Sequence, residues 1–161
     1  MKAMPKQLLV PEKVWRDTLT SFAPYANTGV EAGCYWYGLR TSDGVALASV
    51  VGVPRQKNTP GNFAVDADDL ACLAQAATWS TLVCVAQVHT HPGRCIRHSD
   101  FDNDNAVSVK VLSIVIPHYG KGPVPFDSIG VHRYEDGRWR CLQGDEVGRI
   151  LTVMPSVVDC R

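Results

Sequence analysis

The segment HTHPGRCIRHSDFD, which runs from His89 to Asp102, brings together side chains that can bind a metal ion. On an extended strand, residues i and i+2 project to the same side, so the imidazoles of His89 and His91 can reach one ion. Asp102 follows a loop that contains Gly93 and can fold back toward the same point. Two neutral imidazoles and one carboxylate are the ligand set of a catalytic zinc ion, which keeps a fourth position for water.

A plainer interpretation is that His89 and His91 are surface residues where a strand meets a loop, because short histidine pairs are weak motifs by themselves. A closed structural zinc site is disfavoured. Such sites more often use paired cysteines, and the six cysteines of this chain show no CxxC spacing. The sequence contains no second cluster of metal-ligating residue types. The pattern therefore predicts one zinc ion per chain, bound by His89, His91 and Asp102 in an open site.

The residues around these ligands resemble the HxHPx(6)SxxD signature of the JAMM (JAB1/MPN/Mov34) metalloproteases, with Ser99 and Asp102 at the expected intervals. The resemblance covers about residues 8 to 140 and includes the helix-then-strand approach at residues 62 to 93. It implies the cytidine-deaminase-like α/β sandwich of that family, in which helices flank a mixed β-sheet. We expect residues 1–161 to form a single domain with its core within 8–142, and the segment 143–161 is left without an assigned role.

The resemblance also implies two catalytic residues. The family places a glutamate at the edge of an early strand, and Glu31 in GVEAGCYWYG occupies that position. Amide hydrolysis needs a carboxylate that takes a proton from water and delivers it to the leaving amine, and this is the role expected of Glu31. The alternative is a solvated glutamate at the end of a strand. Local sequence predicts that Ser99 is a helix N-cap with Asp102 at the third helical position. The resemblance adds donation of a hydrogen bond from Ser99 to an oxyanion.

The function implied by the resemblance is that of a zinc peptidase or isopeptidase acting after the C-terminal tail of a ubiquitin-like protein. The reaction serves either deconjugation or precursor processing. The chain is similar to stand-alone bacterial JAB proteins found beside ubiquitin-like conjugation components, including those of antiviral defence operons. Activating and conjugating enzymes of the same operon are then expected partners. Loops 54–62 and 117–127 are the candidate walls of a site in which an extended tail binds by strand addition.

Two other functions remain as alternatives. The first is a catalytically silent, zinc-containing MPN module that binds a ubiquitin-like partner, although the intact Glu31, Ser99 and metal ligands favour an enzyme. The second is a relative of the RadC-like proteins linked to DNA metabolism, or of peptidases that trim a sulfur-carrier protein. RadC-like chains typically carry HNHPSG, whereas this chain has HTHPGRCIRHS.

The composition is that of a small cytoplasmic enzyme. Sixteen basic and sixteen acidic residues cancel, and no basic block occurs, which argues against a nucleic-acid partner. No apolar stretch is long enough to cross a membrane, and the N-terminal residues lack the features of a signal peptide. Scattered cysteines indicate reduced thiols, and Cys72 and Cys84 are expected to be buried because they lie in apolar patterns.

Hydrophobic periodicity predicts alternating helices and strands. One helix begins with Pro11 at its first position and is ended by Pro24, and a second is capped by Asp66. The predicted strands are 33–40, 45–53, an interior strand at 82–88 covered on both faces, 111–116, and a hairpin of 128–134 against 138–142. Residues 54–62 and 117–127 are loops, His98 is an exposed loop residue, and a short helix after residue 143 is weakened by two glycines.

Overall fold

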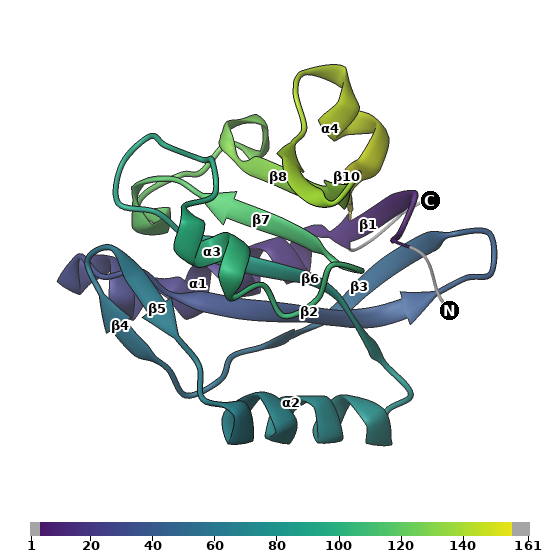
Figure 1. The fold of residues 1–161 in the computed structure, drawn as a ribbon, viewed down its shortest axis with the longest axis horizontal. Helices are drawn as coiled ribbons and strands as arrows, with labels where there is room; N and C mark the ends of the chain where they lie inside the picture. The colour runs from purple at the N-terminus through teal and green to yellow at the C-terminus, as the bar shows by residue number, and fades with distance from the viewer. Residues whose placement is uncertain (1–3, 156–161) are drawn as a thin grey trace, which may run out of the picture.

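A mixed sheet of eight strands forms the centre of the computed structural model, which describes residues 4–155 (Figure 1). The order across the sheet is β10-β1-β3-β2-β6-β7-β8-β9. These strands are β1 (Gln7–Pro11), β2 (Gly33–Arg40), β3 (Val45–Gly52), β6 (Val83–Thr90), β7 (Leu112–Ile116), β8 (Gly130–Glu135), β9 (Arg138–Cys141) and β10 (Leu151–Met154). The helices are α1 (Glu12–Thr28), α2 (Ala67–Trp79), α3 (Asp100–Asp104) and α4 (Asp145–Ile150). Helices flank both faces of the sheet, so the predicted mixed α/β architecture is confirmed at this level.

Strand β6 lies in the middle of the sheet, antiparallel to β2 on one side and parallel to β7 on the other. The register places His89 opposite Gly33 and Val115. The strand continues to Thr90, so His89 is the residue before its last. The expectation that both faces are covered along the whole strand is wrong at its start, because Val83 is 37% exposed.

Helix α1 packs on one face of the sheet and forms the main core with it. Phe22 is fully buried, as are Trp36 on β2 and Ile114 on β7. The indole Nε1 of Trp36 donates a hydrogen bond to Thr18 Oγ1 of α1 at 2.8 Å, so the one polar atom of this large side chain is satisfied inside the core.

Two expectations about α1 are wrong. Pro11 is the last residue of β1 and the N-cap of the helix, and Pro24 lies inside the helix, which continues to Thr28. A proline in a helix interior costs about 3 kcal/mol. Phe22 and Ala26 are buried on either side of Pro24, and we infer that their packing offsets this cost. The helix ends at Gly29, whose φ of 70° is readily adopted only by glycine.

Helix α2 covers the opposite face of the sheet only in part (Figure 1). Ala77 is its one buried residue, and Leu70 and Leu73 are half-buried against Tyr35 and Tyr37 of β2. This thin contact leaves the start of β6 exposed.

Two predictions of burial are wrong. Cys72 is exposed because it lies on the face of α2 opposite Leu70, Leu73 and Ala77, and the thin contact leaves Cys84 on β6 half-buried. The predicted N-cap Asp66 does occupy that position, but its side chain makes no capping hydrogen bond and pairs with Lys57 at 3.2 Å instead.

Short strands account for the remaining differences from the sequence prediction. Strands β1 and β10 are parallel neighbours at one edge of the sheet, with Leu8 opposite Leu151, so the segment after residue 143 supplies α4 and an edge strand. The expected loop at 54–62 instead contains most of a two-stranded hairpin, formed by β4 (Lys57–Thr59) and β5 (Asn62–Ala64). None of the helices among the described residues is long and apolar enough to cross a membrane.

Candidate metal centre

The side chains of His89, His91 and Asp102 converge at the end of β6. The two histidine Nε2 atoms are 3.2 Å apart, His91 Nε2 is 3.2 Å from Asp102 Oδ2, and His89 Nε2 is 3.3 Å from Asp102 Oδ1. In a tetrahedral zinc site with bonds of about 2.0–2.1 Å, neighbouring ligand atoms lie roughly 3.3–3.4 Å apart. All three side chains are buried, and their spacing fits one ion coordinated in this way.

A backbone contact decides which ring nitrogen of His91 carries a proton. His91 Nδ1 donates to the carbonyl oxygen of Cys95 at 3.0 Å, because a carbonyl can only accept. A neutral His91 ring therefore points the Nε2 lone pair at Asp102. A lone pair and a carboxylate attract only when a cation or a proton lies between them. The donor set thus fits a bound metal ion.

The pKa shifts of Asp102 and His89 agree with this arrangement, whereas the shift of His91 favours its protonated form. Burial by itself would raise the pKa of Asp102, but its contacts with His89 and His91 hold that pKa well below its usual range. Burial lowers the pKa of His89, whereas Asp102 raises the pKa of His91 against the effect of burial. An ionised carboxylate and a neutral imidazole are the forms in which these side chains bind metals.

Ser99 caps α3, as predicted, and it holds Asp102 in place. The backbone N–H of Asp102 donates to Ser99 Oγ at 3.2 Å, and the N–H and hydroxyl of Ser99 each donate to Asp102 Oδ2 at 2.7 Å. Asp102 is at the third helical position, where this pair forms a reciprocal capping box. The single hydroxyl proton of Ser99 is directed at Asp102.

Glu31 interacts electrostatically with His91 and Asp102 but is not one of the three converging side chains. It precedes β2, and its backbone N–H donates to Thr59 O at 2.8 Å while its carbonyl accepts from Asn58 Nδ2 at 2.7 Å. The residue is 3% exposed, unlike a solvated glutamate at a strand end. Burial raises the pKa of its carboxyl to about 7, while His91 lowers it and Asp102 raises it by smaller amounts.

Thr90, between the two histidines, joins the end of β6 to the segment that carries Glu31. Its hydroxyl accepts a hydrogen bond from Ala32 N at 3.0 Å, and its N–H donates to Ala32 O at 3.0 Å. Sequence reasoning missed this residue, although its position between two candidate ligands was a usable signal. These two hydrogen bonds hold Ala32, the residue after Glu31, beside the strand end that carries His89 and His91.

The β4–β5 hairpin lies over the same end of the sheet. Phe63 of β5 has its ring centroid 5.7 Å from that of His89. A Cβ atom on Gly33 would lie 2.1 Å from the Phe63 ring, so only glycine permits this contact. The hydroxyl of Tyr119 donates to Pro60 O at 2.9 Å, which ties the hairpin turn to the segment after β7.

That segment also contacts the loop after the ligands. His118 and Tyr119 are consecutive non-glycine residues with φ of 55° and 56°, a conformation that costs about 1–3 kcal/mol per residue. Their N–H groups donate to Gly93 O at 2.9 Å and to His91 O at 2.7 Å. The expected loop at 117–127 is therefore fixed against the candidate metal centre, and it contains short 3-10 turns at His118–Gly120 and Phe126–Ser128.

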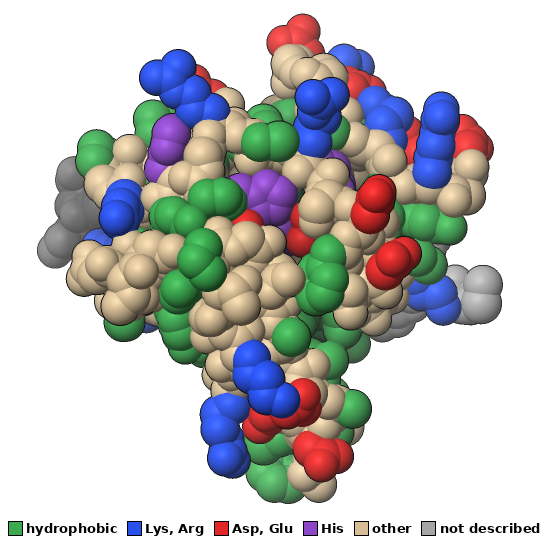
Figure 2. Space-filling model, turned by 60° about the vertical axis from the view of Figure 1, so that its left-hand side comes forward, with side chains coloured by type: hydrophobic (Ala, Val, Ile, Leu, Met, Phe, Trp, Pro, Cys, Tyr) green, Lys and Arg blue, Asp and Glu red, His purple; other side chains and the backbone are tan. Residues whose placement is uncertain are grey.

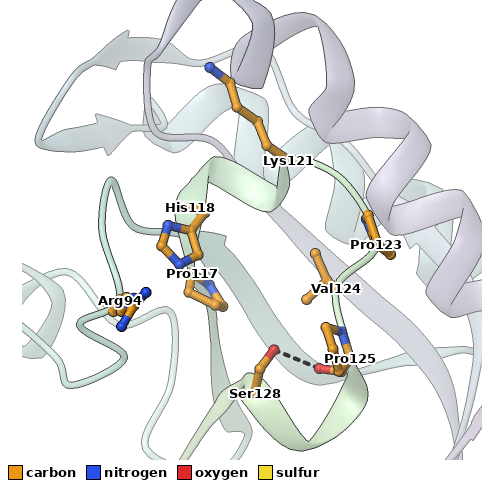
Figure 3. A pocket seen from close by; sticks show the side chains of 8 residues that line it. All are labelled: Arg94, Pro117, His118, Lys121, Pro123, Val124, Pro125 and Ser128. Carbon is orange, nitrogen blue, oxygen red and sulfur yellow. Dashed lines mark hydrogen bonds between the residues drawn. The ribbon is translucent and has the colours of Figure 1, made fainter.

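A pocket of about 360 Å³ opens beside these contacts. Figure 3 shows Arg94 and His118 on one side of it and Val124 and Pro125 on the other. Within residues 4–155, Arg94 has no ion-pair partner. The space-filling view in Figure 2 shows histidine and acidic atoms together near the centre of one face, with uncharged side chains around them and lysine and arginine farther out.

A second pair of histidines lies on the sheet face that carries His89. The expected exposure of His98 is wrong, because its half-buried ring stacks on His132 with centroids 3.9 Å apart and an interplanar angle of 16°. The pKa of His98 is lowered to about 4 and that of His132 to about 3, mainly by burial and to a smaller extent by nearby histidines. Neither ring nitrogen of His132 has a hydrogen-bond partner of normal geometry in the described part of the chain, although the backbone of Ser113 is close enough to raise its pKa slightly.

We predict that His132→Phe makes the protein less sensitive to acid. A histidine whose folded pKa lies below its unfolded value of about 6.5 binds more protons when unfolded, so its stability contribution is complete above pH 6.5 and is lost toward pH 3. The free energy of unfolding of the variant relative to the original protein should rise as the pH falls from 7 to 4, by at most about 1.4 kcal/mol per pH unit. Urea unfolding at several pH values measures this difference, and two parallel pH curves would contradict the prediction.

Comparisons of the sequence and of the fold with known proteins show what this chain is similar to. No family model matches the sequence. A protein of Sinorhizobium fredii named "Probable metalloprotease y4jG" is 26% identical over 132 residues, which span 78% of this chain and 80% of that protein. The similarity therefore covers most of both chains.

Two solved structures share the fold. Protein DSY2949 from Desulfitobacterium hafniense superimposes with a TM-score of 0.72 over 94% of this chain and 95% of its own, at 14% identity. A protein from Salinibacter ruber gives a TM-score of 0.54 over 79% of this chain and 86% of its own, at 18% identity. These similarities show the fold, which is a mixed α/β sheet with flanking helices. The chemistry has to be argued from the residues of the site.

Proposed function

We propose that this protein is a metallopeptidase of the JAMM type that holds zinc with His89, His91 and Asp102. The observation that carries the proposal is the convergence of three buried ligand atoms at 3.2–3.3 Å beside a buried carboxyl, Glu31, whose pKa is raised to about 7. The relative named as a metalloprotease, which covers most of the chain, supports the same class.

Bound zinc would supply an acidified water molecule and polarise the scissile carbonyl group. Glu31 acts as the general base and acid: its carboxylate accepts the proton of the water and delivers it to the leaving amine. A carboxyl with a pKa near 7 is well suited to both steps around neutral pH. Thr90 and Gly33 hold the glutamate and the histidines in register for this exchange.

The proposed substrate is the C-terminal tail of a ubiquitin-like protein, in a conjugate or a precursor. The β4–β5 hairpin supports this choice, because the edge of β5 that faces away from β4 can accept an extended strand. It adjoins the site through Glu31 N and Thr59 O. The pocket lined by Arg94 and His118 would accept a neighbouring part of the substrate.

The proposed setting is a cytoplasmic one, in an operon with activating and conjugating enzymes such as those of antiviral defence, without nucleic acid or membrane as partner. Five free cysteines among the described residues support a reducing compartment: Cys34, Cys72, Cys84, Cys95 and Cys141.

A cleavage assay with metal analysis tests the proposed function. Purified protein should contain one zinc ion per chain and cleave a ubiquitin-like protein from a reporter fused to its C-terminus. Chelation should abolish cleavage, and added zinc should restore it. Mass spectrometry of the products identifies the bond. Full zinc content with no cleavage of a panel of ubiquitin-like fusions would contradict the proposed substrate, and a zinc-free but active protein would contradict the proposed metal.

Replacing Ser99 separates its two roles by magnitude. Loss of an N-cap costs about 0.5–2 kcal/mol of stability, whereas loss of an oxyanion donor costs roughly 10²–10³ in turnover. The oxyanion role requires the hydroxyl of Ser99 to turn from Asp102 to the substrate during the reaction. We expect Ser99→Ala to show both effects and Ser99→Thr, which keeps a hydroxyl, to retain more activity. Aspartate is unsuitable here because it would place a second carboxylate where Ser99 Oγ now lies 2.7 Å from Asp102. A destabilised Ser99→Ala variant with normal turnover per bound zinc would leave capping as the only role.

A further inference from the structure

Helix α3, which presents Asp102, has almost no packing of its own. It contains five residues, and Asp102 is its one buried side chain. Phe101, its only large apolar residue, is 37% exposed. Helices of this length are not stable in isolation. The position of α3 on the sheet must therefore come from hydrogen bonds made by the residues in and around it.

His98 makes two such hydrogen bonds from opposite sides of one ring. Its Nδ1 is 3.0 Å from Asn103 Oδ1 on α3, and its Nε2 is 2.8 Å from Ser113 Oγ on β7. A neutral imidazole satisfies both contacts if Nδ1–H donates to Asn103 and the hydroxyl of Ser113 donates to Nε2. Ser113 is 1% exposed. The ring thus connects the metal-binding helix to a strand in the middle of the sheet.

The surroundings of His98 restrict the movement of this connection. One face of the ring stacks on His132, and Trp139 contacts it edge-on with centroids 5.2 Å apart. The chain leading to His98 passes directly over β8, where a Cβ atom on Gly130 would lie 2.2 Å from Ile96 O. The ring of His89 is a third neighbour, with its centroid 5.9 Å away. A ring held by two hydrogen bonds and three aromatic neighbours has few alternative rotamers, so it can set the position of what it binds.

We propose that His98 is a positioning residue of the metal centre, which joins α3 to β7 through Asn103 and Ser113 and so keeps Asp102 at ligand distance from His89 and His91. The inference rests on the metal site proposed above. It accounts for a half-buried histidine that neither binds the ion nor takes part in proton transfer. It also explains why a helix without an apolar face lies in one place: the site is preorganised before the ion binds, which raises metal affinity.

Metal affinity in matched variants tests this role. His98→Phe keeps a ring in the stack and removes both hydrogen bonds, whereas His132→Phe changes the other ring of the same stack and removes none of them. We expect the zinc dissociation constant, measured by competition with a chromogenic chelator, to rise about 10–100-fold in His98→Phe and to change much less in His132→Phe. Equal affinities of His98→Phe and the unchanged protein would overturn the proposal, as would equal losses in the two variants.

Two further variants examine the hydrogen bond itself. Ser113→Ala should weaken zinc binding, and the double variant His98→Phe/Ser113→Ala should weaken it no more than His98→Phe alone, because both changes remove the same contact. His98→Gln, which carries a polar group near the position of Nε2, should recover part of the affinity. Additive losses in the double variant would show that the two residues act separately.

A readout without metal keeps the inference testable if a variant is unstable or if the proposed metal site is wrong. Amide hydrogen exchange of residues 99–105 in metal-free protein reports how firmly α3 is held. We expect His98→Phe to accelerate exchange there while exchange in α1 stays unchanged. Absence of zinc binding by the unchanged protein would refute the metal centre alone, whereas unaltered exchange in His98→Phe would refute the positioning role.

Discussion

Glu31→Gln is expected to lose about 10²–10⁴-fold in peptide hydrolysis, the range typical of general acid–base groups, while it keeps its fold and its zinc. Glutamine has nearly the shape of glutamate but cannot accept the proton of a water molecule. The burial of Glu31 favours this substitution, because a neutral amide at a 3% exposed position avoids the cost of burying a charge. The measurement is kcat for a fused ubiquitin-like substrate at saturating zinc.

The Glu31→Gln result needs a control for stability and for charge. Asp104→Asn also removes one carboxylate, but from an exposed position at the end of α3, and it should leave kcat close to the original value. Thermal unfolding of Glu31→Gln should occur at or above the original temperature, since burial raises the pKa of the native carboxyl to about 7 and shows that its charged form is disfavoured there. Unchanged turnover in Glu31→Gln with normal zinc would remove this residue from the mechanism.

The pH dependence of the reaction follows from the same burial. If Glu31 must be ionised to accept a proton, kcat/KM should increase as the pH rises through the pKa of this carboxyl in the free enzyme, and the increase should be absent from the residual activity of Glu31→Gln. The measurement is a profile of kcat/KM between pH 5 and 8. Zinc content measured at each pH distinguishes the rise in kcat/KM caused by ionisation of Glu31 from a change caused by loss of metal. A rising limb that persists in the variant would belong to another group.

The convergence of His89, His91 and Asp102 is the part of the structure that the sequence predicted best, because the three residues lie within one short segment. His89 and His91 are held by strand geometry, and Asp102 by a cap that Ser99 makes three residues earlier. Over such short separations in sequence, strand alternation and helix capping are sufficient to predict which side chains come together. The polar residues that support the site lie on separate strands, and their proximity depends on the sheet register.

His98 and His132 illustrate this limit. His132 is opposite Ser113 on β7, and Ser113 is opposite Gln87 on β6, so three residues distant in sequence share one face. No local pattern of the chain reports that pairing. The same reason explains the missed strands β1 and β10, which are four or five residues long and are stabilised by parallel pairing between the two ends of the described chain.

Proline and apolar patterns gave wrong predictions where tertiary packing determines the end of a helix or the burial of a side chain. Pro24 carries a strong local signal for the end of a helix, yet α1 continues because Phe22 and Ala26 are buried on either side of it. In α2 the predicted apolar stripe does form one helix face, but that face covers the sheet only in part, which leaves Cys84 on β6 half-buried, while Cys72 lies on the opposite, exposed face of the helix. Periodicity predicts which residues share a face and does not predict how fully that face is buried.

The double variant His89→Ala/His91→Ala is expected to bind no zinc at the site and to show no hydrolysis above background. The remaining ligand, Asp102, cannot hold the ion alone. The variant should also be less stable, because the buried carboxylate of Asp102 loses both of its histidine partners. Removing one side of a buried charged contact costs on the order of 3 kcal/mol. Elemental analysis of dialysed protein measures the metal, and urea unfolding measures the stability.

Adding Asp102→Asn to the double variant distinguishes loss of metal from loss of fold. The amide removes the unpaired charge and can still accept hydrogen bonds from Ser99, so the triple variant should regain part of the stability and remain free of zinc. A folded, zinc-free triple variant without activity supports the three residues as the ligands. Full zinc occupancy in the folded double variant would show instead that the ion binds elsewhere, and the spacing of 3.2–3.3 Å among the three side chains would then reflect a shared proton.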